Sequence, residues 1–330
     1  MKRGWITWDQ EELPRAAFDA RLAAVGDHLA ERDLPALVVY TDIWKSNHAR
    51  HFSNFMPYWN RALLLIARQA KPVLLCGLSP RVYPWIRSVT ILEEILPSPD
   101  LAKRLVELCS EKGWKRIGVL DLAGLPYDLN QAISSAPVEA VDLSLPLVPD
   151  EWELGMYRHA AKMAREGLME ELAGGVGLVD HEFTGLLERK FRRAGAEDLV
   201  VLLTNGKTVP LPARGEILGE RFSVALALEY RGHWVKVVQN PVGHASGLPS
   251  GASTEVLSGP YPYESGNGAL VSARWETLRD GVRLFFGDTY WRTAAGVERA
   301  RIWSRRSWPE PAAGRWSSPE TWWWRRLTSW

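Results

Sequence analysis

Cysteine is scarce in this sequence, and neither sign of charge dominates it. Only Cys76 and Cys109 occur among 330 residues, and both lie in apolar runs. We therefore expect buried free thiols rather than a disulfide-stabilised scaffold. Lysine and arginine total 40 against 39 aspartates and glutamates, which gives a net charge of +1. This balance creates no broad positive field for nucleic acid or an anionic membrane, so we expect neither as a partner.

Long hydrophobic runs are also missing. No stretch approaches the roughly 20 apolar residues that span a bilayer, and residues 1–11 lack the apolar segment of a secretory signal. We therefore expect a cytoplasmic protein. Its hydrophobic fraction of 46% and charged fraction of 24% are typical of globular chains. A length of 330 residues suits two ordinary domains.

The first 147 residues alternate between helical and strand patterns. Residues 12–32 carry apolar side chains at helical spacing, and a short β-rich run follows. The expected strands are residues 36–40, 62–67, 73–78, 89–95, 116–122 and 138–143, with further helices at 101–112 and 127–134. This alternation predicts an α/β domain with a mixed sheet over residues 1–147.

A domain boundary is predicted near residue 148, where two prolines interrupt the chain. Asp150 and Glu153 then form the capping box that opens a helix, expected to run to about residue 172. Asp180 is expected to cap a second helix. The expected strands are residues 199–203, 222–230 and 234–238, the last two joined by a turn at 231–232. Residues 148–300 are thus predicted to form an α+β domain with antiparallel strands.

Residues 301–330 differ in composition from the rest of the chain. They hold seven of the 17 tryptophans, mixed with arginine, serine and proline and with few branched aliphatic residues. Neither helical nor strand periodicity is present, so we expect a tail that does not pack. The alternative is that the chain is a truncated or frameshifted product of an active parent.

Three segments have the pattern of a known family. They are HARHFSNF at residues 48–55, DEWELGMYRHAAKMAREGL at 150–168 and GERFSVALALEYRGHWVKVVQN at 219–240. Together they resemble the creatinase, aminopeptidase P and prolidase family, peptidase M24. The resemblance implies a creatinase-type N-terminal α/β domain, followed by a shortened α+β domain of the pita-bread fold. It also implies a homodimer.

The metal-binding positions of this family carry other residues here. The two metal-binding aspartates of the family fall on Ala225 and Lys236, and a metal-binding glutamate falls on Gly287. A substrate-contacting histidine falls on Ala213, in the segment LPARG. Alanine and glycine have no side-chain ligand atom, and a lysine ammonium is a cation without an acceptor. The resemblance thus supports the fold, while these residues predict no metal and no other cofactor.

Other polar residues are candidates for a functional site. Glu229 and His233 flank the turn at 231–232 and form the best available acid/base pair, although neighbouring strand residues point to opposite faces. Lys236 is a candidate for contact with a substrate. In the family, the N-terminal domain faces the pocket of the partner subunit, and the corresponding pocket candidates here are His48, His51, Trp59 and Arg61. Both of these histidines are expected on a loop.

Two functions fit these observations. The first is a pseudo-enzyme that keeps the peptidase fold and binds a small molecule or a short peptide without metal-dependent hydrolysis. The alternative is a metal-independent, creatinase-like hydrolase of a small C–N substrate, which would depend on Glu229 and His233.

Overall fold

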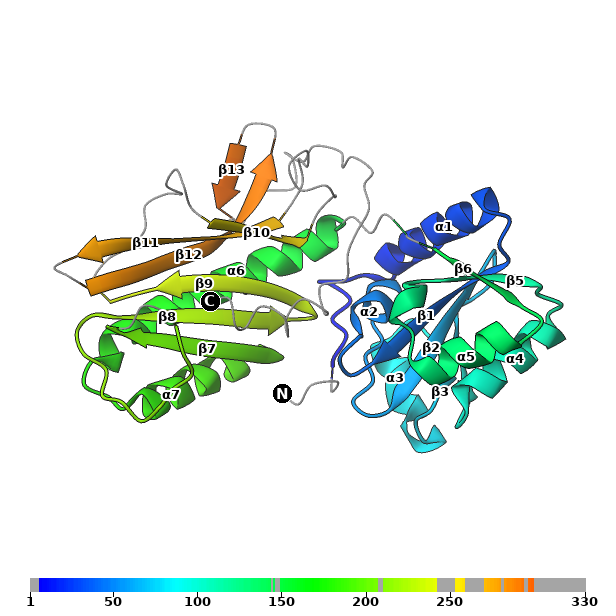
Figure 1. Ribbon diagram of the computed structural model, residues 1–330, viewed down its shortest axis with the longest axis horizontal. Coiled ribbons are helices and arrows are strands. Elements are labelled where there is room, and N and C mark those ends of the chain that lie inside the picture. The colour runs from blue at the N-terminus through cyan, green and yellow to red at the C-terminus, as the bar shows by residue number, and fades with distance from the viewer. Residues whose placement is uncertain are drawn as a thin grey trace. The chain divides into compact units, whose positions relative to one another are not determined.

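The computed structural model describes residues 6–143, 145, 149–206, 210–241, 253–258, 270–279, 282–293 and 296–299. The chain divides into two compact units (Figure 1). The described residues up to Leu145 form the first unit, and those from residue 149 onward form the second. The tryptophan-rich segment 301–330 lies outside the described residues.

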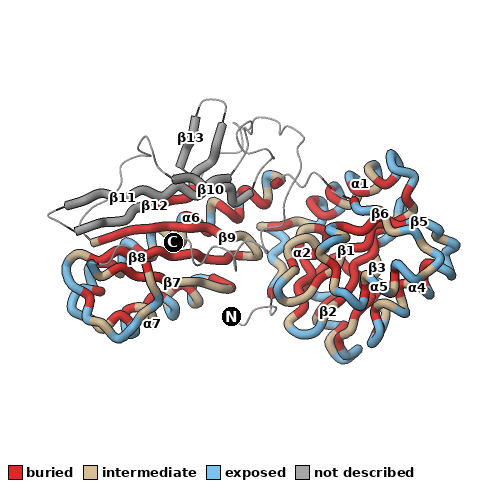
Figure 2. The backbone as a smooth tube through the Cα atoms, in the orientation of Figure 1, coloured by how far each residue is buried: buried red, intermediate tan, exposed pale blue. Residues whose placement is uncertain are grey.

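A six-stranded mixed sheet organises the first unit, as the alternating pattern predicted. Its strand order is β4-β3-β2-β1-β5-β6. β1 pairs with β2 in antiparallel and with β5 in parallel orientation. The strands are β1 (Ala36–Asp42), β2 (Arg61–Ala67), β3 (Val73–Cys76), β4 (Glu94–Pro97), β5 (Arg116–Val119) and β6 (Glu139–Asp142). β1 and β2 are buried along most of their length (Figure 2).

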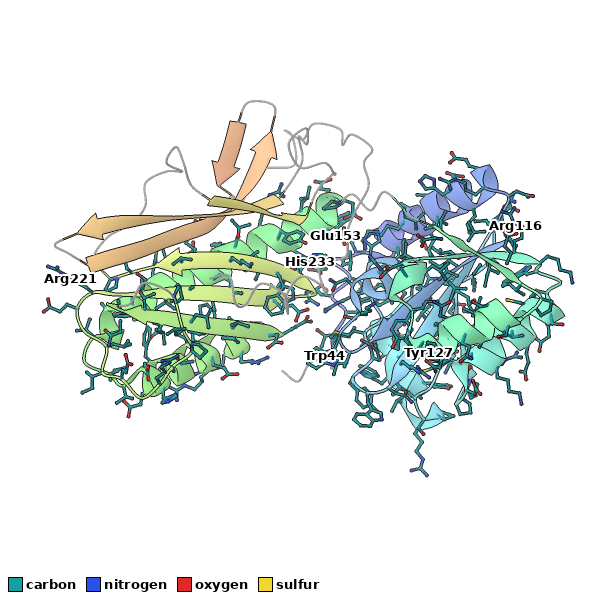
Figure 3. The ribbon with its side chains drawn as sticks, in the orientation of Figure 1. Trp44, Arg116, Tyr127, Glu153, Arg221 and His233 are labelled. Carbon is teal, nitrogen blue, oxygen red and sulfur yellow. The ribbon has the colours of Figure 1, made fainter. Side chains whose placement is uncertain are left out.

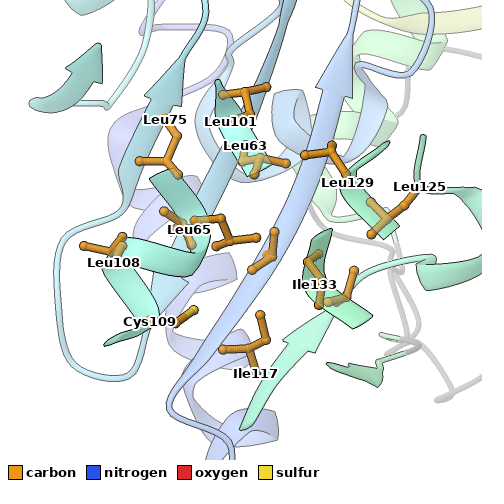
Figure 4. Close-up of a cluster of buried hydrophobic side chains, with 13 residues drawn as sticks. Leu63, Leu65, Leu75, Leu101, Leu108, Cys109, Ile117, Leu125, Leu129 and Ile133 are labelled. Atoms are coloured by element: carbon orange, nitrogen blue, oxygen red, sulfur yellow. The ribbon is translucent and has the colours of Figure 1, made fainter. Parts of the chain in front are cut away.

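Helices cover this sheet and close its core. They are α1 (Arg15–Glu31), α2 (Asn47–Ser53), α3 (Tyr83–Val89), α4 (Leu101–Glu111) and α5 (Tyr127–Ser135), with 3-10 turns η1 (Pro80–Val82) and η2 (Leu122–Gly124). The Asp100 side chain starts α4 by accepting the N–H of Lys103 at 3.0 Å. Leucines from β2, β3, α4 and α5 form one buried cluster (Figure 4). Cys76 and Cys109 are buried free thiols, as predicted, and burial raises the pKa of each to about 11.

The strand predicted at residues 89–95 is largely wrong. α3 ends at Val89, and β4 covers only Glu94–Pro97. Ile91 and Leu92 between them are buried in a connecting segment. A short apolar run therefore marked burial here and not a strand, because a buried connection has the same composition.

The second unit combines two long helices with a seven-stranded sheet. α6 (Glu151–Leu172) opens with Asp150, whose side chain accepts the N–H of Glu153 at 2.9 Å as the capping-box pattern predicted. The 3-10 turn η3 (Ala173–Gly175) and α7 (Asp180–Arg193) follow. The strands are β7 (Asp198–Asn205), β8 (Phe222–Tyr230), β9 (His233–Gln239), β10 (Ser253–Ser258), β11 (Leu270–Arg279), β12 (Val282–Thr293) and β13 (Gly296–Arg299). The order is β10-β11-β12-β9-β8-β7, with β13 on β12.

The two faces of β8 carry side chains of different size. Phe222, Val224, Leu226, Leu228 and Tyr230 alternate with Ser223, Ala225, Ala227 and Glu229. The larger set faces the helices, since the rings of Phe183 on α7 and Phe222 lie 5.5 Å apart. We call this the helix face of the sheet and the other the open face.

No helix in the described part of the chain is long and apolar enough to cross a bilayer.

Candidate functional site

Three positions that the sequence resemblance assigns to metal ligands lie close together on the open face. Ala225 of β8 pairs with Val238 of β9, and Val238 pairs with Gly287 of β12. Residues paired across strands share a face, so Ala225 and Gly287 flank Val238 from either side. Lys236 lies two residues before Val238 on the same face.

Lys236 is held firmly in this surface. Its backbone N–H donates to Thr289 Oγ1 at 3.2 Å, and that hydroxyl donates to the Lys236 carbonyl at 3.0 Å. The residue is 4% exposed. Its partner on β8 is Ala227. A long cationic side chain thus rises between a methyl group and a hydroxyl that already bonds the β9 backbone.

Glu229 is a second buried charged residue on the open face. It is 1% exposed and pairs with Trp234 on β9 and Asp198 on β7. Lys236 is its diagonal neighbour across the β8–β9 hairpin, at a separation of about 7 to 8 Å for such positions. The structure therefore brings together two residues that were predicted for different roles.

His233 points to the helix face instead. It pairs with Tyr230, and its ring centroid lies 4.6 Å from that of Tyr157 on α6. The Tyr230 ring stacks on His159 of the same helix at 4.5 Å. Figure 3 labels His233 at the start of β9. Glu229 and His233 stand on opposite faces of the sheet, so the structure does not bring the predicted acid/base pair together.

The LPARG segment is anchored by Asp180. This carboxylate accepts the backbone N–H of Arg214 at 2.7 Å and that of Gly215 at 2.8 Å. Burial raises the pKa of Asp180, but these and neighbouring backbone donors outweigh burial and hold it below its usual range. Asp180 is the first residue of α7 and was expected to cap the helix. Its side chain instead fixes the loop that carries Ala213.

A buried ion pair behind the open face was not predicted from the sequence. Arg165 of α6 donates from Nη1 to both oxygens of Asp288 on β12, at 2.8 and 2.9 Å. Asp288 is 1% exposed. Two features of the sequence could have indicated the pair. Arg165 lies three residues before Leu168, on the buried side of the helix, and Asp288 is a charged residue inside a strand. The pair ties α6 to β12 directly behind Gly287 and Thr289.

In the first unit, His48 and His51 lie one turn apart on α2 and not on a loop as expected. Burial lowers the pKa of His48 to about 4, assisted by the charges of His51 and Lys45 and opposed by Asp121. This helix ends where Asn54 takes the left-handed conformation, at a φ of 59°.

The other two pocket candidates of the first unit are Arg61, which is bonded to another side chain, and Trp59, which is exposed to solvent. Arg61 donates to both oxygens of Asp128, with one bond of 3.0 Å to Oδ1. Trp59 is 72% exposed. Of the two, Trp59 is the side chain that is open to a ligand.

Known structures share this architecture. The Xaa-Pro dipeptidase from Bacillus anthracis aligns with a TM-score of 0.65 and 14% identity, over 89% of this chain and 99% of that chain. The X-Pro aminopeptidase from Thermotoga maritima gives 0.65 and 14%, over 86% and 98%. The chain has the fold of the Xaa-Pro peptidases.

Another structure with the same fold is described as an enzyme with a di-nuclear active site. The X-prolyl aminopeptidase from Caenorhabditis elegans, a cytosolic enzyme with a di-nuclear active site, aligns with a TM-score of 0.56 and 10% identity, over 89% of this chain and 62% of that chain. No family model matches the present sequence, and no curated relative does.

The residues on the open face do not fit a pair of divalent metals. Ala225 and Gly287 offer no side-chain donor, and Lys236 brings a positive charge. Throughout the described ranges, no group of three histidine, cysteine, aspartate or glutamate side chains is placed to hold a metal ion. The chain thus has the Xaa-Pro peptidase fold, with an alanine, a lysine and a glycine at these three positions of the sheet.

Proposed function

We propose that this protein binds a small molecule or a short peptide on an Xaa-Pro peptidase fold and does not hydrolyse peptides with a bound metal. The observation that carries the proposal is the placement of Ala225, Lys236 and Gly287 around Val238 on one buried face. By the sequence resemblance, these are the positions of three metal ligands.

Electrostatics support the proposal. A divalent ion 4 Å from an ammonium is repelled by about 8 kcal/mol at an effective dielectric constant of ~20. The strand pair β8–β9 is nevertheless complete in register from Val224↔Gln239 to Tyr230↔His233. The pairing of these two strands is therefore intact, and we propose that only metal binding is absent.

Location and assembly also belong to the proposal. We infer a cytoplasmic homodimer, in keeping with the family resemblance and with the description of the Caenorhabditis elegans structure as a cytosolic enzyme. Trp59, which is open to solvent, is a proposed ligand contact of the first unit, and His48, His51 and Arg61 are the other proposed contacts there. Lys236 and Glu229 are the proposed polar contacts of the second unit.

Calorimetric titration with Mn²⁺ and Co²⁺, together with hydrolysis assays on Xaa-Pro dipeptides, tests the proposal. We expect no stoichiometric metal binding and no turnover. A solved Xaa-Pro dipeptidase with the same fold, assayed under identical conditions, is the positive control. Stoichiometric metal binding accompanied by metal-dependent turnover would overturn the proposal.

A further inference from the structure

The strand β7 lies at one edge of the sheet of the second unit (Figure 1). On its inner side it pairs with β8 along its whole length. On its outer side, the N–H of Leu203 donates to the Leu211 carbonyl at 2.8 Å, and the N–H of Leu211 donates to the Leu203 carbonyl at 2.9 Å. This contact is an isolated antiparallel bridge. Residues 199–201 lie beyond it and are half-buried.

The register shows which backbone groups of β7 point outward. In an antiparallel sheet, the N–H and C=O of one residue face the same neighbouring strand, and the next residue faces the other way. Leu203 uses both groups on the outer side, so Leu199 and Val201 also direct theirs away from β8. Glu229 agrees with this alternation, because its carbonyl accepts the N–H of Glu197 at 2.8 Å and it pairs with the residue before Leu199.

Three of these outward groups are open to a ligand. The N–H of Leu199 already donates to Asp198 Oδ1, at 2.9 Å. Within the described part of the chain, neither the C=O of Leu199 nor the N–H and C=O of Val201 has a bonding partner on this side. Such groups on an edge strand are a template for a further strand. Residues 199–201, which we call the β7 edge, can therefore take three hydrogen bonds.

The β7 edge lacks features that protect two other sheet edges of this protein. In the first unit, the edge strand β6 begins with Glu139 and ends with Asp142, and the opposite edge strand β4 ends with Pro97. Charged residues and prolines at an edge discourage pairing with another chain. The β7 edge consists of a leucine and two valines instead. These residues favour pairing with another extended chain.

We propose that the β7 edge binds a short extended peptide as an additional antiparallel strand. The N–H and C=O of the peptide residue opposite Val201 bond the C=O and N–H of Val201. The peptide N–H two positions further on donates to the C=O of Leu199. Main-chain bonding of this kind is a common way for a sheet to recognise a peptide. The inference goes beyond the proposed function, since it does not depend on whether a metal binds on the open face.

The length of the β7 edge favours a short peptide over a second copy of this chain. Leu211 occupies the place opposite Leu203, so a chain laid along the edge must end or turn away there. The strand β7 has eight residues, and a second copy of it would run through Leu211. Three residues of an extended peptide span about 10 Å, and three is the number that pairs with residues 199–202 before Leu211 is reached.

The side chains beside the β7 edge indicate which peptide fits. Val200 and Leu202 pack with Ala225 and Val238 on the open face. Peptide residues opposite Val200 and Leu202 place their side chains on this same face. Apolar β-branched neighbours across a strand pair are favourable there. We therefore expect valine or isoleucine at the first and third positions of the peptide, on either side of the residue that bonds Val201.

N-methylated peptides test the pairing on the full chain. The probe is acetyl-Val-Thr-Val-amide, in which the N–H of the middle residue faces Val201 and the N–H of the last valine faces away from β7. Methylation of the middle N–H should weaken binding by about fivefold or more, the ratio that one lost hydrogen bond produces. Methylation of the N–H of the last valine should leave the affinity unchanged. Ligand-observed NMR measures both affinities. Equal effects of the two methyl groups would overturn the proposal, and so would absence of binding.

Proline substitutions locate the site. V201P removes an outward N–H without removing a hydrogen bond between β7 and β8, and an edge strand tolerates proline at such a position. We expect it to weaken binding of the probe by about fivefold. L199P is the matched control, because the N–H of Leu199 is bonded to Asp198 and is not offered to the peptide.

Equal affinities of V201P and L199P for the probe would refute the site. If V201P does not fold, the comparison of the two methylated peptides on the parent chain still decides. Metal-dependent hydrolysis of Xaa-Pro dipeptides is read separately, as the failure of the proposed function.

Discussion

Replacing Asp180 by alanine should loosen the loop that carries Ala213 and destabilise the second unit. The carboxylate is 5% exposed and accepts two backbone N–H groups, at 2.7 and 2.8 Å. Each hydrogen bond to a charged group contributes about 1.5 to 3 kcal/mol. Because both bonds are lost, we expect D180A to lower the free energy of unfolding by about 3 to 5 kcal/mol.

The effect should depend on pH in a definite direction. The folded-state pKa of Asp180 lies below its usual range, so the folded state binds this proton less readily than the unfolded state does. The stabilisation is therefore complete above the unfolded pKa of about 3.9 and is lost as the pH falls through the folded value. The deficit of D180A should be largest near pH 7 and should shrink on acidification below about pH 4.

Urea unfolding followed by far-UV circular dichroism would measure these differences. E182A is the matched control, because Glu182 is an exposed acidic residue in the same first turn of α7. It should cost less than about 1 kcal/mol. A D180A deficit no larger than that of E182A would refute the reasoning, and so would one that is independent of pH.

Two further predictions concern buried charged groups. R165M should lower the free energy of unfolding by about 3 to 5 kcal/mol, because it removes the arginine that pairs with the buried Asp288. In a double-mutant cycle measured by denaturation, adding D288N should restore part of this loss. Strictly additive losses would contradict the pairing. His48, with a pKa lowered to about 4, must release its proton to fold, so the native state should lose up to about 3 kcal/mol between pH 6.5 and 4. In H48Q this pH dependence, measured by urea unfolding, should be weaker than in the parent, whereas H51Q should retain it.

Much of the fold could be predicted because it follows from local patterns. The capping box at Asp150 and the hairpin at residues 231–232 identified α6 and the β8–β9 pair to within a residue or two. These signals involve residues close in sequence, where periodicity and turn chemistry suffice. The helix α2 was not predicted because its seven residues are too few to show a helical period.

The site was harder to predict because it depends on register. Sequence alone placed Glu229 and His233 close together, whereas strand pairing separates them and makes Lys236 the diagonal neighbour of Glu229. Arg165 and Asp288 are 123 positions apart, and only the packing of α6 on the sheet joins them. Long-range pairing of this kind has no local signature in a single sequence.

The alternation of large and small residues along β8 has a consequence for evolution. One strand packs against the helices with one side and carries Ser223, Ala225, Ala227 and Glu229 on the other, so selection can act on the two sides independently. A substitution on the open face can remove one reaction, or install another, while the side that holds α6 and α7 is untouched. With such a strand, the function of a protein can change during evolution while its fold stays the same.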